Sequence, residues 1–399
     1  MFLFDIADRF ASLDHSNVTL DSKRCLHSLY RFSDCEACYS ICPANAITSG
    51  KVPSLDSAKC QTCLACLTVC PVGAYSSDDS VSSLMSAVTH LDGSALELLC
   101  DRNPKSPFGL SDSSTGICVH GCLAGLGSGT YLALVAFGLE HINIRMDACS
   151  GCEWKTLPRQ VEEQVTKAKQ LLDAWGKAES LNIVFEMSTS VERPVWNSTN
   201  PPVSRRDLFR TLTHQGQATI ARVIQDEPTR SDHRPGRDRL RLLSAITRLP
   251  DPVSTNISDL GGMGFASLSS SEDCVACGTC ARACPTHALQ FVRTENDTAF
   301  ILSLSVKDCV GCDICARVCT SKTLKVDHTP TFAQIFGEGV LMLREGGLVK
   351  CEQCGTLIAA RPGVRLCQFC DFRQTHPIGS MQVSGINNLT PQVAAKKPD

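Results

Sequence analysis

Aromatic side chains and long hydrophobic runs are scarce in this sequence. Aromatic residues make up 6% of its 399 positions, so we do not expect large aromatic cores to hold the fold together. No stretch approaches about 18 uninterrupted apolar residues, the length that marks a membrane-spanning helix. The first ten residues carry acids where a secretory signal peptide needs an apolar run. We therefore expect neither a secreted protein nor a membrane span.

Strong net charge and familiar catalytic constellations are also missing. The formal net charge is -3, which argues against nucleic acid as the main partner. None of the ten histidines forms an i, i+4 pair, so surface or packing roles are expected for them. No flavin motif, molybdopterin motif or nucleophile constellation is readable. The sequence therefore gives no direct evidence of a substrate site.

Cysteine is the residue that the sequence has in excess, with 25 copies. Disulfide scaffolds are short secreted chains, whereas this chain is long and its cysteine count is odd. We therefore expect a cytoplasmic protein whose reduced thiols bind metal. The cysteines fall within 25–70, 100–152, 274–319 and 351–370. This clustering divides the chain into modules.

One cysteine spacing occurs three times in full, as CxxCxxCxxxC. The copies begin at Cys60, Cys274 and Cys309, and the last has Thr320 where the others have proline. In a fourth copy the leading Cys25 is displaced upstream by a short insertion, so that nine residues separate it from Cys35. In such runs three close cysteines hold one iron–sulfur cubane and the fourth reaches the other cluster of a pair. Zinc on paired CxxC knuckles is the alternative, and it fits this spacing poorly.

Residues 25–76 and 273–325 each resemble a bacterial two-cluster ferredoxin domain. The resemblance implies four [4Fe–4S] clusters with crossed ligands. In the first domain it implies the sets Cys25, Cys35, Cys38, Cys70 and Cys60, Cys63, Cys66, Cys42. In the second domain it implies the sets Cys274, Cys277, Cys280, Cys319 and Cys309, Cys312, Cys315, Cys284.

Residues 93–190 predict a parallel α/β domain, because apolar strand-like runs alternate with helical stretches. The expected strands are 95–100, 116–122, 141–149 and 181–187, and the expected helices are 130–139 and 157–175. Ligands bind beyond the carboxyl ends of such strands. Four cysteines lie at or just after strand ends: Cys100, Cys122, Cys149 and Cys152. We expect a further [2Fe–2S] or [4Fe–4S] cluster there, with buried structural thiols or a zinc site as alternatives.

Two other features of this domain bear on its function. The segments GCLAGL and ACSGCEW make it similar to the small iron–sulfur delta subunit that links hydrogenases to heterodisulfide reductase. Gly125, Gly127 and Gly129 open a helix as in a nucleotide-binding turn, but they do not form GxGxxG. A helix start capped by Ser128 or Thr130 explains these glycines equally well. Cys118, in mid-strand, is expected to be a buried apolar residue.

The remaining segments are a linker, a metal site and the two ends of the chain. Residues 191–272 are rich in Pro, Ser and Asn and predict a linker with two short helices. Its arginines indicate either a solvated helical linker or a contact for an acidic partner or for the cluster modules. Residues 348–373 predict a zinc ribbon, with iron as the alternative, held by Cys351, Cys354, Cys367 and Cys370. We expect an N-terminal helix over 1–24 and a mobile tail over 374–399.

Together these features predict an α+β multidomain chain in which two dicluster ferredoxin domains flank a parallel α/β domain, followed by a zinc ribbon. The expected function is electron transfer through four [4Fe–4S] clusters and a fifth centre. The chain would serve a larger anaerobic enzyme of the formate dehydrogenase, hydrogenase or heterodisulfide-reductase class. The alternatives are an oxidoreductase with a catalytic α/β domain, and an iron–sulfur sensor or assembly factor.

Overall fold

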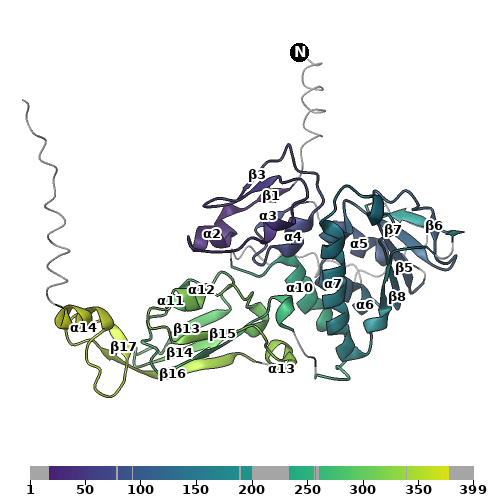
Figure 1. Cartoon of the computed structure of the whole chain (residues 1–399). Helices are drawn as coiled ribbons and strands as arrows, with labels where there is room; N and C mark the ends of the chain where they lie inside the picture. The colour runs from purple at the N-terminus through teal and green to yellow at the C-terminus, as the bar shows by residue number, and fades with distance from the viewer. Residues whose placement is uncertain are drawn as a thin grey trace, which may run out of the picture.

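The residues that the structure describes form four units and a linker segment (Figure 1). The computed structural model describes residues 18–77, 80–91, 93–187, 190–199, 233–255, 257, 260–337 and 339–376. We name the units by their described residues: module 1 (18–77), the α/β domain (80–199), module 2 (260–337) and the ribbon (339–376). None of the described helices combines the length and hydrophobicity needed to cross a bilayer.

Module 1 is built from two short antiparallel strand pairs. Strand β1 (Thr19–Leu20) pairs with β4 (Tyr75–Ser76), and β2 (Ile47–Thr48) pairs with β3 (Ser54–Leu55). The helical turns between them are η2 (Ser22–Arg24), α2 (Leu26–Leu29), α3 (Ala37–Ile41) and α4 (Ala65–Val69). Of the helix predicted over 1–24, the part from residue 1 to residue 17 lies outside the described residues. In the described part the prediction was wrong, because β1 pairs with the last strand of the module.

Module 2 repeats this strand pairing. Strand β12 (Ser267–Ser270) pairs with β15 (Leu324–Asp327), and β13 (Leu289–Arg293) pairs with β14 (Ala299–Leu304). Its helices are η7 (Gly261–Met263), α11 (Thr279–Arg282), η8 (Val306–Asp308), α12 (Ile314–Arg317) and α13 (Phe332–Phe336).

The ribbon continues the sheet of module 2. Strand β16 (Leu341–Lys350) pairs with β14, and β17 (Leu357–Ala359) pairs with β16, which gives the order β13-β14-β16-β17. Helix α14 (Gln368–Thr375) follows. Shared backbone hydrogen bonds therefore attach the ribbon to module 2. The tail predicted from residue 374 lies outside the described residues from 377 onward, and residues 374–375 belong to α14.

The α/β domain contains the predicted parallel sheet, with five strands rather than the four expected, in the order β11-β7-β5-β8-β9. Its strands are β5 (Ala95–Cys100), β7 (Thr115–Val119), β8 (His141–Arg145), β9 (Leu181–Val184) and β11 (Val195–Asn197). Its helices are α5 (Ser80–Val88), α6 (Ser128–Ala136) and α7 (Leu157–Leu172), with the single turns η3 (Leu123–Gly125), η4 (Cys149–Gly151), η5 (Asp173–Trp175) and η6 (Ala178–Ser180). A small antiparallel pair joins β6 (Phe108–Gly109) to β10 (Val191–Glu192). The linker predicted from residue 191 therefore begins too early, because β10 and β11 belong to this domain.

One linker helix, α10 (Arg237–Ile246), packs against α6 (Figure 1). A Cβ atom at Gly129 would meet the Asp238 carbonyl oxygen at 2.1 Å, so this glycine permits the close approach of α10. The Asp238 carboxylate accepts hydrogen bonds from the backbone N–H of Gly129 (3.0 Å) and Thr130 (3.2 Å). The cap of α6 is therefore Asp238 rather than Ser128 or Thr130. A carboxylate of the chain itself fills the position that a nucleotide phosphate would take.

The linker and the two modules also contact one another. Arg239 of α10 donates hydrogen bonds to the carbonyl oxygens of Met263 (2.8 Å) and Cys309 (3.2 Å) in module 2. This contact agrees with the interpretation that the basic linker binds the cluster modules. Apolar residues of both modules form one buried cluster: Leu26, Val72, Ala74, Val310 and Ile314. The modules flank the α/β domain in sequence, but in space they touch each other.

Candidate metal centres

The same backbone turn follows the fourth cysteine of all four cysteine runs. Three residues after each of these cysteines the backbone is left-handed, with φ between 47° and 59° at Asn45, Gly73, His287 and Lys322. Such a conformation costs a non-glycine residue roughly 1–2 kcal/mol. The turn aims a backbone N–H at the sulfur in three runs: Ala46 to Cys42 (3.3 Å), Ala74 to Cys70 (3.2 Å) and Thr323 to Cys319 (3.4 Å). The run with Thr320 in place of proline makes the same turn.

The CxxCxxC loops share a second conformational feature. The residues on both sides of the middle cysteine are left-handed in each full copy: Thr62 and Leu64, Ala276 and Gly278, Gly311 and Asp313. Two such residues bend the loop on both sides of its middle cysteine. The copy with the insertion lacks this feature, because neither Asp34 nor Glu36, on either side of Cys35, has a positive φ. The copy whose leading cysteine is displaced thus also differs from the others in the backbone conformation around its middle cysteine.

The thiols of module 1 lie in two groups. Burial raises the pKa of Cys66, and electrostatic repulsion raises it further, from Cys63, Cys60 and Cys42 in the same group and then from Cys38 in the other group. Burial also raises the pKa of Cys70, with added repulsion from Cys35 and Cys38. Cys25 in turn contributes to the raised pKa of Cys38, after burial. Burial thus favours the neutral form of Cys66 in one group and of Cys70 in the other, so ionised ligands at these two positions need a nearby cation.

Module 2 shows the same arrangement. Burial raises the pKa of Cys280 to about 12, with added repulsion from Cys277, Cys274 and Cys319. Burial likewise raises the pKa of Cys315, with added repulsion from Cys309, Cys312 and Cys284 in the same set and then from Cys280 in the other set. At Cys319 burial acts in the same direction, but hydrogen bonds with Thr323 and Ser321 outweigh it and lower the pKa to about 7. Iron prefers thiolate ligands, so all four groups have suitable donor chemistry for it.

The four predicted cysteines of the α/β domain are neighbours at the carboxyl edge of its sheet. Cys100 ends β5, Cys122 follows β7, and Cys149 and Cys152 flank the turn after β8. Burial raises the pKa of Cys122 to about 12, with repulsion from Cys100, Cys63 and Cys149. It raises the pKa of Cys149 to about 11, with repulsion from Cys100 and Cys152. Cys118 lies within β7 but is half-buried, not fully buried as predicted.

The loop of module 1 from Cys60 to Cys66 packs against this edge. A Cβ atom at Gly121 would meet the Thr62 carbonyl oxygen at 2.8 Å, and one at Gly125 would meet the Leu64 Cβ at 2.9 Å. The indole N–H of Trp154 also donates a hydrogen bond to the Gln61 side chain. The glycines of GCLAGL thus allow a cysteine loop from another unit to approach. Sequence reasoning missed this contact, because no local pattern reports it.

A network of buried ion pairs lies next to the turn that follows β8, where Cys149 and Cys152 are found. Glu97 Oε2 lies 2.8 Å from both Arg145 and Arg193, and all three side chains are inaccessible to solvent. Burial opposes the ionisation of Glu97, but hydrogen bonds from Arg193, Ser114 and Arg145 outweigh it and lower its pKa to about 2. Arg145 also binds Asp147, two residues before Cys149, at 2.7 Å. This network positions the turn that contains Cys149 and Cys152.

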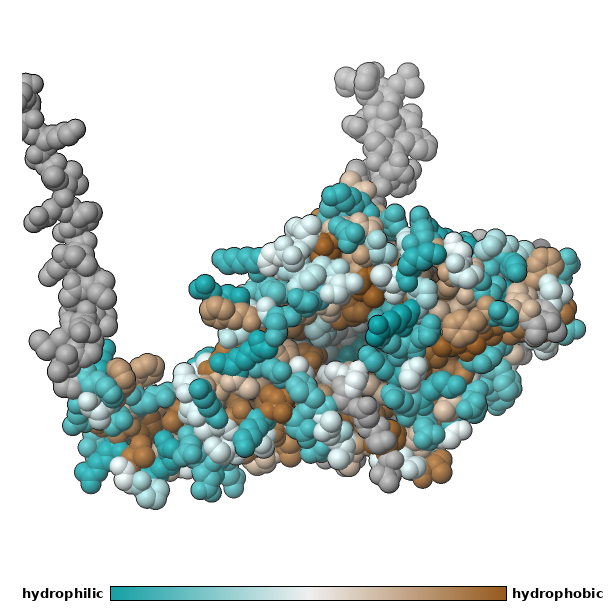
Figure 2. Space-filling view, in the orientation of Figure 1, coloured by the Kyte–Doolittle hydropathy of each residue, from teal (hydrophilic) through white to brown (hydrophobic). Residues whose placement is uncertain are grey.

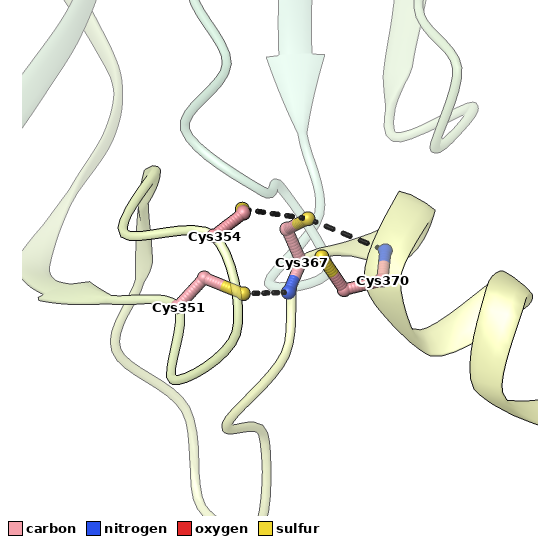
Figure 3. A group of neighbouring side chains, drawn as sticks. All are labelled: Cys351, Cys354, Cys367 and Cys370. Carbon is pink, nitrogen blue, oxygen red and sulfur yellow. Dashed lines mark hydrogen bonds between the residues drawn. The ribbon is translucent and has the colours of Figure 1, made fainter.

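The four ribbon cysteines form a separate site (Figure 3). The sulfur atoms of Cys351, Cys354, Cys367 and Cys370 all lie within 4.8 Å of one another. The sulfurs of Cys354 and Cys367 are 3.7 Å apart. Tetrahedral zinc with Zn–S bonds of about 2.3 Å requires S–S separations of about 3.8 Å. The backbone N–H of Cys367 donates to Cys351 Sγ (3.2 Å). The site therefore has the size and ligand type of a four-thiolate metal centre.

Comparison with known families identifies the two modules. The family model of the 4Fe-4S dicluster domain matches residues 31–74 and 273–323. The first match begins after Cys25, so the displaced cysteine stands outside it. A comparison with curated proteins finds no match. The matched segments cover about a quarter of the chain. The chain thus contains two ferredoxin-type dicluster domains, and many cysteines lie outside them.

Proposed function

We propose that this chain is an electron-transfer protein that holds four [4Fe–4S] clusters in its two modules and a fifth cluster in its α/β domain. The main support is the backbone turn after each fourth cysteine, which occurs four times in this chain, within the segments that match the dicluster family. The proposed ligand sets are the crossed sets named above, with Cys100, Cys122, Cys149 and Cys152 for the fifth centre. When bound, such clusters accept and release single electrons.

The chain's own residues would set the properties of each site. Burial of the thiols excludes water, and backbone N–H groups donate to the sulfurs of Cys42, Cys70 and Cys319. Both effects tune the reduction potential of an iron–sulfur site. The repeated turns therefore serve two purposes, because they direct the thiolates inward and supply hydrogen bonds to them.

Contacts between the units favour a serial arrangement of the five sites. Repulsion between Cys63 and Cys122 reflects the closeness of the central site to one set of module 1. The apolar cluster between the modules is packed by Cys70 on one side and Cys312 on the other. A series of sites has two ends and needs an electron donor and an acceptor. This supports a role within a larger anaerobic redox enzyme.

We also propose which class of enzyme this chain serves. The α/β domain is similar to the delta subunit that links hydrogenases to heterodisulfide reductase. We therefore favour a cytoplasmic complex of the formate dehydrogenase, hydrogenase or heterodisulfide-reductase class. Zinc is the proposed ion at the ribbon, because the separation of Cys354 and Cys367 matches tetrahedral thiolate zinc.

An EPR-monitored redox titration of the anaerobically purified chain tests this function. We expect reversible uptake of one electron per cluster. The variant Cys122→Ala should lose only the signal of the fifth centre, whereas the matched variant Cys118→Ala, in the same strand region, should keep all signals. Clusters that break down on reduction, or that take up no electrons, would indicate a sensor or an assembly factor instead.

A further inference from the structure

A cavity of about 330 Å³ lies where the two modules, the α/β domain and the linker helix meet. Its walls come from α4 and the residues after it, from α7, from α10 and from the segment around η7. Figure 2 shows the surface hollowed between module 1 and module 2, beside the position that α7 takes in Figure 1. Of the described residues that line the cavity, Cys70 alone is a cysteine, so the cavity is not itself one of the sulfur sets. Cavities of about 300–1,000 Å³ bind small molecules.

Helix α7 gives the cavity a polar wall. Four of its side chains line the cavity at spacings of three and four residues, which place them on one face of the helix: Gln160, Glu163, Gln164 and Lys167. The apolar residues of α7 lie in the core of the α/β domain. Gln160 and Gln164 are buried, and burying a polar side chain is unfavourable unless it finds hydrogen-bond partners. The hydrogen bonds of these two glutamines therefore show what the cavity lacks.

Both buried glutamines have hydrogen-bond donors to offer. The amide nitrogen of Gln160 is shielded from solvent and donates to none of the residues that the structure describes. The side-chain oxygen of Gln164 accepts a hydrogen bond from the backbone N–H of Ser128 (3.1 Å), which leaves the amide nitrogen of Gln164 as its remaining polar group. A buried donor without an acceptor destabilises the fold, so the cavity favours a ligand that presents acceptor oxygens.

The charged side chains around the cavity favour a negatively charged ligand. Both acids are already engaged, because Glu163 accepts a hydrogen bond from Arg159 (2.9 Å) and Asp238 accepts hydrogen bonds from the backbone of α6. Both cations lack an acid partner: Arg239 donates to backbone carbonyl oxygens of module 2, and Lys167 forms no ion pair within the described part of the chain. The positive charge that remains calls for an anion.

The other walls of the cavity are largely apolar. Module 1 supplies Leu67 and Pro71, α10 supplies Leu242, and module 2 supplies Met263 and Val310. A fully hydrated inorganic ion would leave these side chains in contact with water. A ligand with an apolar body would cover them and gain from the burial. The cavity thus combines donors and positive charge on one side with apolar surface on the other.

We propose that this cavity binds a small organic carboxylate with an apolar body. The carboxylate accepts hydrogen bonds from Gln160 and Gln164 and lies near Lys167, and the apolar body packs against the walls that the modules and α10 supply. The bound molecule lies beside Cys70, and it contacts the two modules and the α/β domain at the same time. This site goes beyond the electron-transfer function, because ligand binding requires no electron to move.

Isothermal titration of the complete anaerobic chain with benzoate, phenylacetate and hexanoate tests this site. At least one of these carboxylates should bind with one-to-one stoichiometry. Benzamide has the shape of benzoate without its charge, and acetate has the charge without an apolar body, so both should bind at least about tenfold more weakly. Gln160→Leu and Lys167→Met each remove one partner of the carboxylate and should raise the Kd at least about tenfold. The matched variant Lys169→Met, in the same helix but outside the cavity wall, should keep the wild-type Kd.

Several outcomes would overturn the site. If none of the three carboxylates binds, or if benzamide or acetate binds as tightly as the best of them, the assigned chemistry is wrong. Wild-type affinity in both Gln160→Leu and Lys167→Met, or an equal loss in Lys169→Met, would place the binding elsewhere. Thermal midpoints show whether each variant is folded, and the comparison of ligands on the wild type decides if the variants are not. Iron counts and the EPR titration test the electron-transfer function separately.

Discussion

Removal of the Glu97 carboxylate should destabilise the α/β domain strongly. In the variant Glu97→Ala, the guanidinium groups of Arg145 and Arg193 lose their common partner while both side chains stay buried. Ser114 loses the acceptor of its 2.7 Å hydrogen bond as well. The variant thus removes the ion-pair partner of Arg193 and leaves Arg145 with Asp147 alone.

The structure sets the expected size of this effect. Breaking a buried ion pair by removing one partner costs about 3–5 kcal/mol. Domains are stable by only about 5–15 kcal/mol, so the variant should lose a large part of its free energy of unfolding. The turn of Cys149 should also loosen, because Arg145 links Glu97 to Asp147, which lies two residues before Cys149. We therefore expect weaker iron binding at the central site and unchanged iron in the modules.

Tryptophan fluorescence gives a direct assay of this domain. The three tryptophans of the chain are Trp154, Trp175 and Trp196, which all lie in the α/β domain. Urea unfolding of the anaerobic variant should show a clearly lower midpoint than wild type. Glu140→Ala, which removes an exposed acid of the same domain, is the control and should stay within about 0.5 kcal/mol of wild type. Equal stability of the two variants would refute the role assigned to the buried charges.

Three further predictions concern acid, the α6–α10 contact and the ribbon. The buried hydrogen bonds lower the pKa of Glu97 to about 2, from its ordinary value of 4.5. The stabilising contribution of the ionised carboxylate is therefore complete above pH 4.5 and is lost as the pH falls toward 2. The urea midpoints at pH 5 and pH 3 should differ more for the wild type than for Glu97→Gln. Gly129→Ala places a Cβ atom against the backbone of α10 and should lower the free energy of unfolding by about 1–3 kcal/mol. The control Gly93→Ala places its Cβ atom in open space and should change this free energy little. Equal thermal midpoints for the two variants would contradict the packing argument. Cys354→Ser should lose the ribbon's zinc in metal analysis while its iron content stays at the wild-type value, and a parallel loss of iron would assign this site to iron.

Local features were predictable from the sequence, and contacts between distant segments were not. The cysteine runs specify their own turns, so the modules could be located from spacing alone. The apolar runs of β5, β7, β8 and β9 predicted the parallel sheet. Strand β11 has three residues, too few for a pattern, and it forms because β7 offers an edge.

The missed features involve partners far apart in sequence. The cap of α6 comes from Asp238, which lies 109 residues from Gly129, so a local search finds only Ser128 or Thr130. Of the glycines that suggest a nucleotide turn, Gly127 and Gly129 make room for α10, and Gly125 makes room for the cysteine loop of module 1. The approach of Cys63 to Cys122 requires a contact between two units, and sequence spacing does not report it.

Iron and sulfide analysis of the complete chain, kept anaerobic throughout, tests the central claim most directly. We predict a brown protein with about 16 iron atoms in the two modules, plus about 2 or about 4 in the α/β domain, and matching sulfide. The same sample should contain one zinc ion. A colourless protein without sulfide, whose module cysteines bind only zinc, would contradict the account.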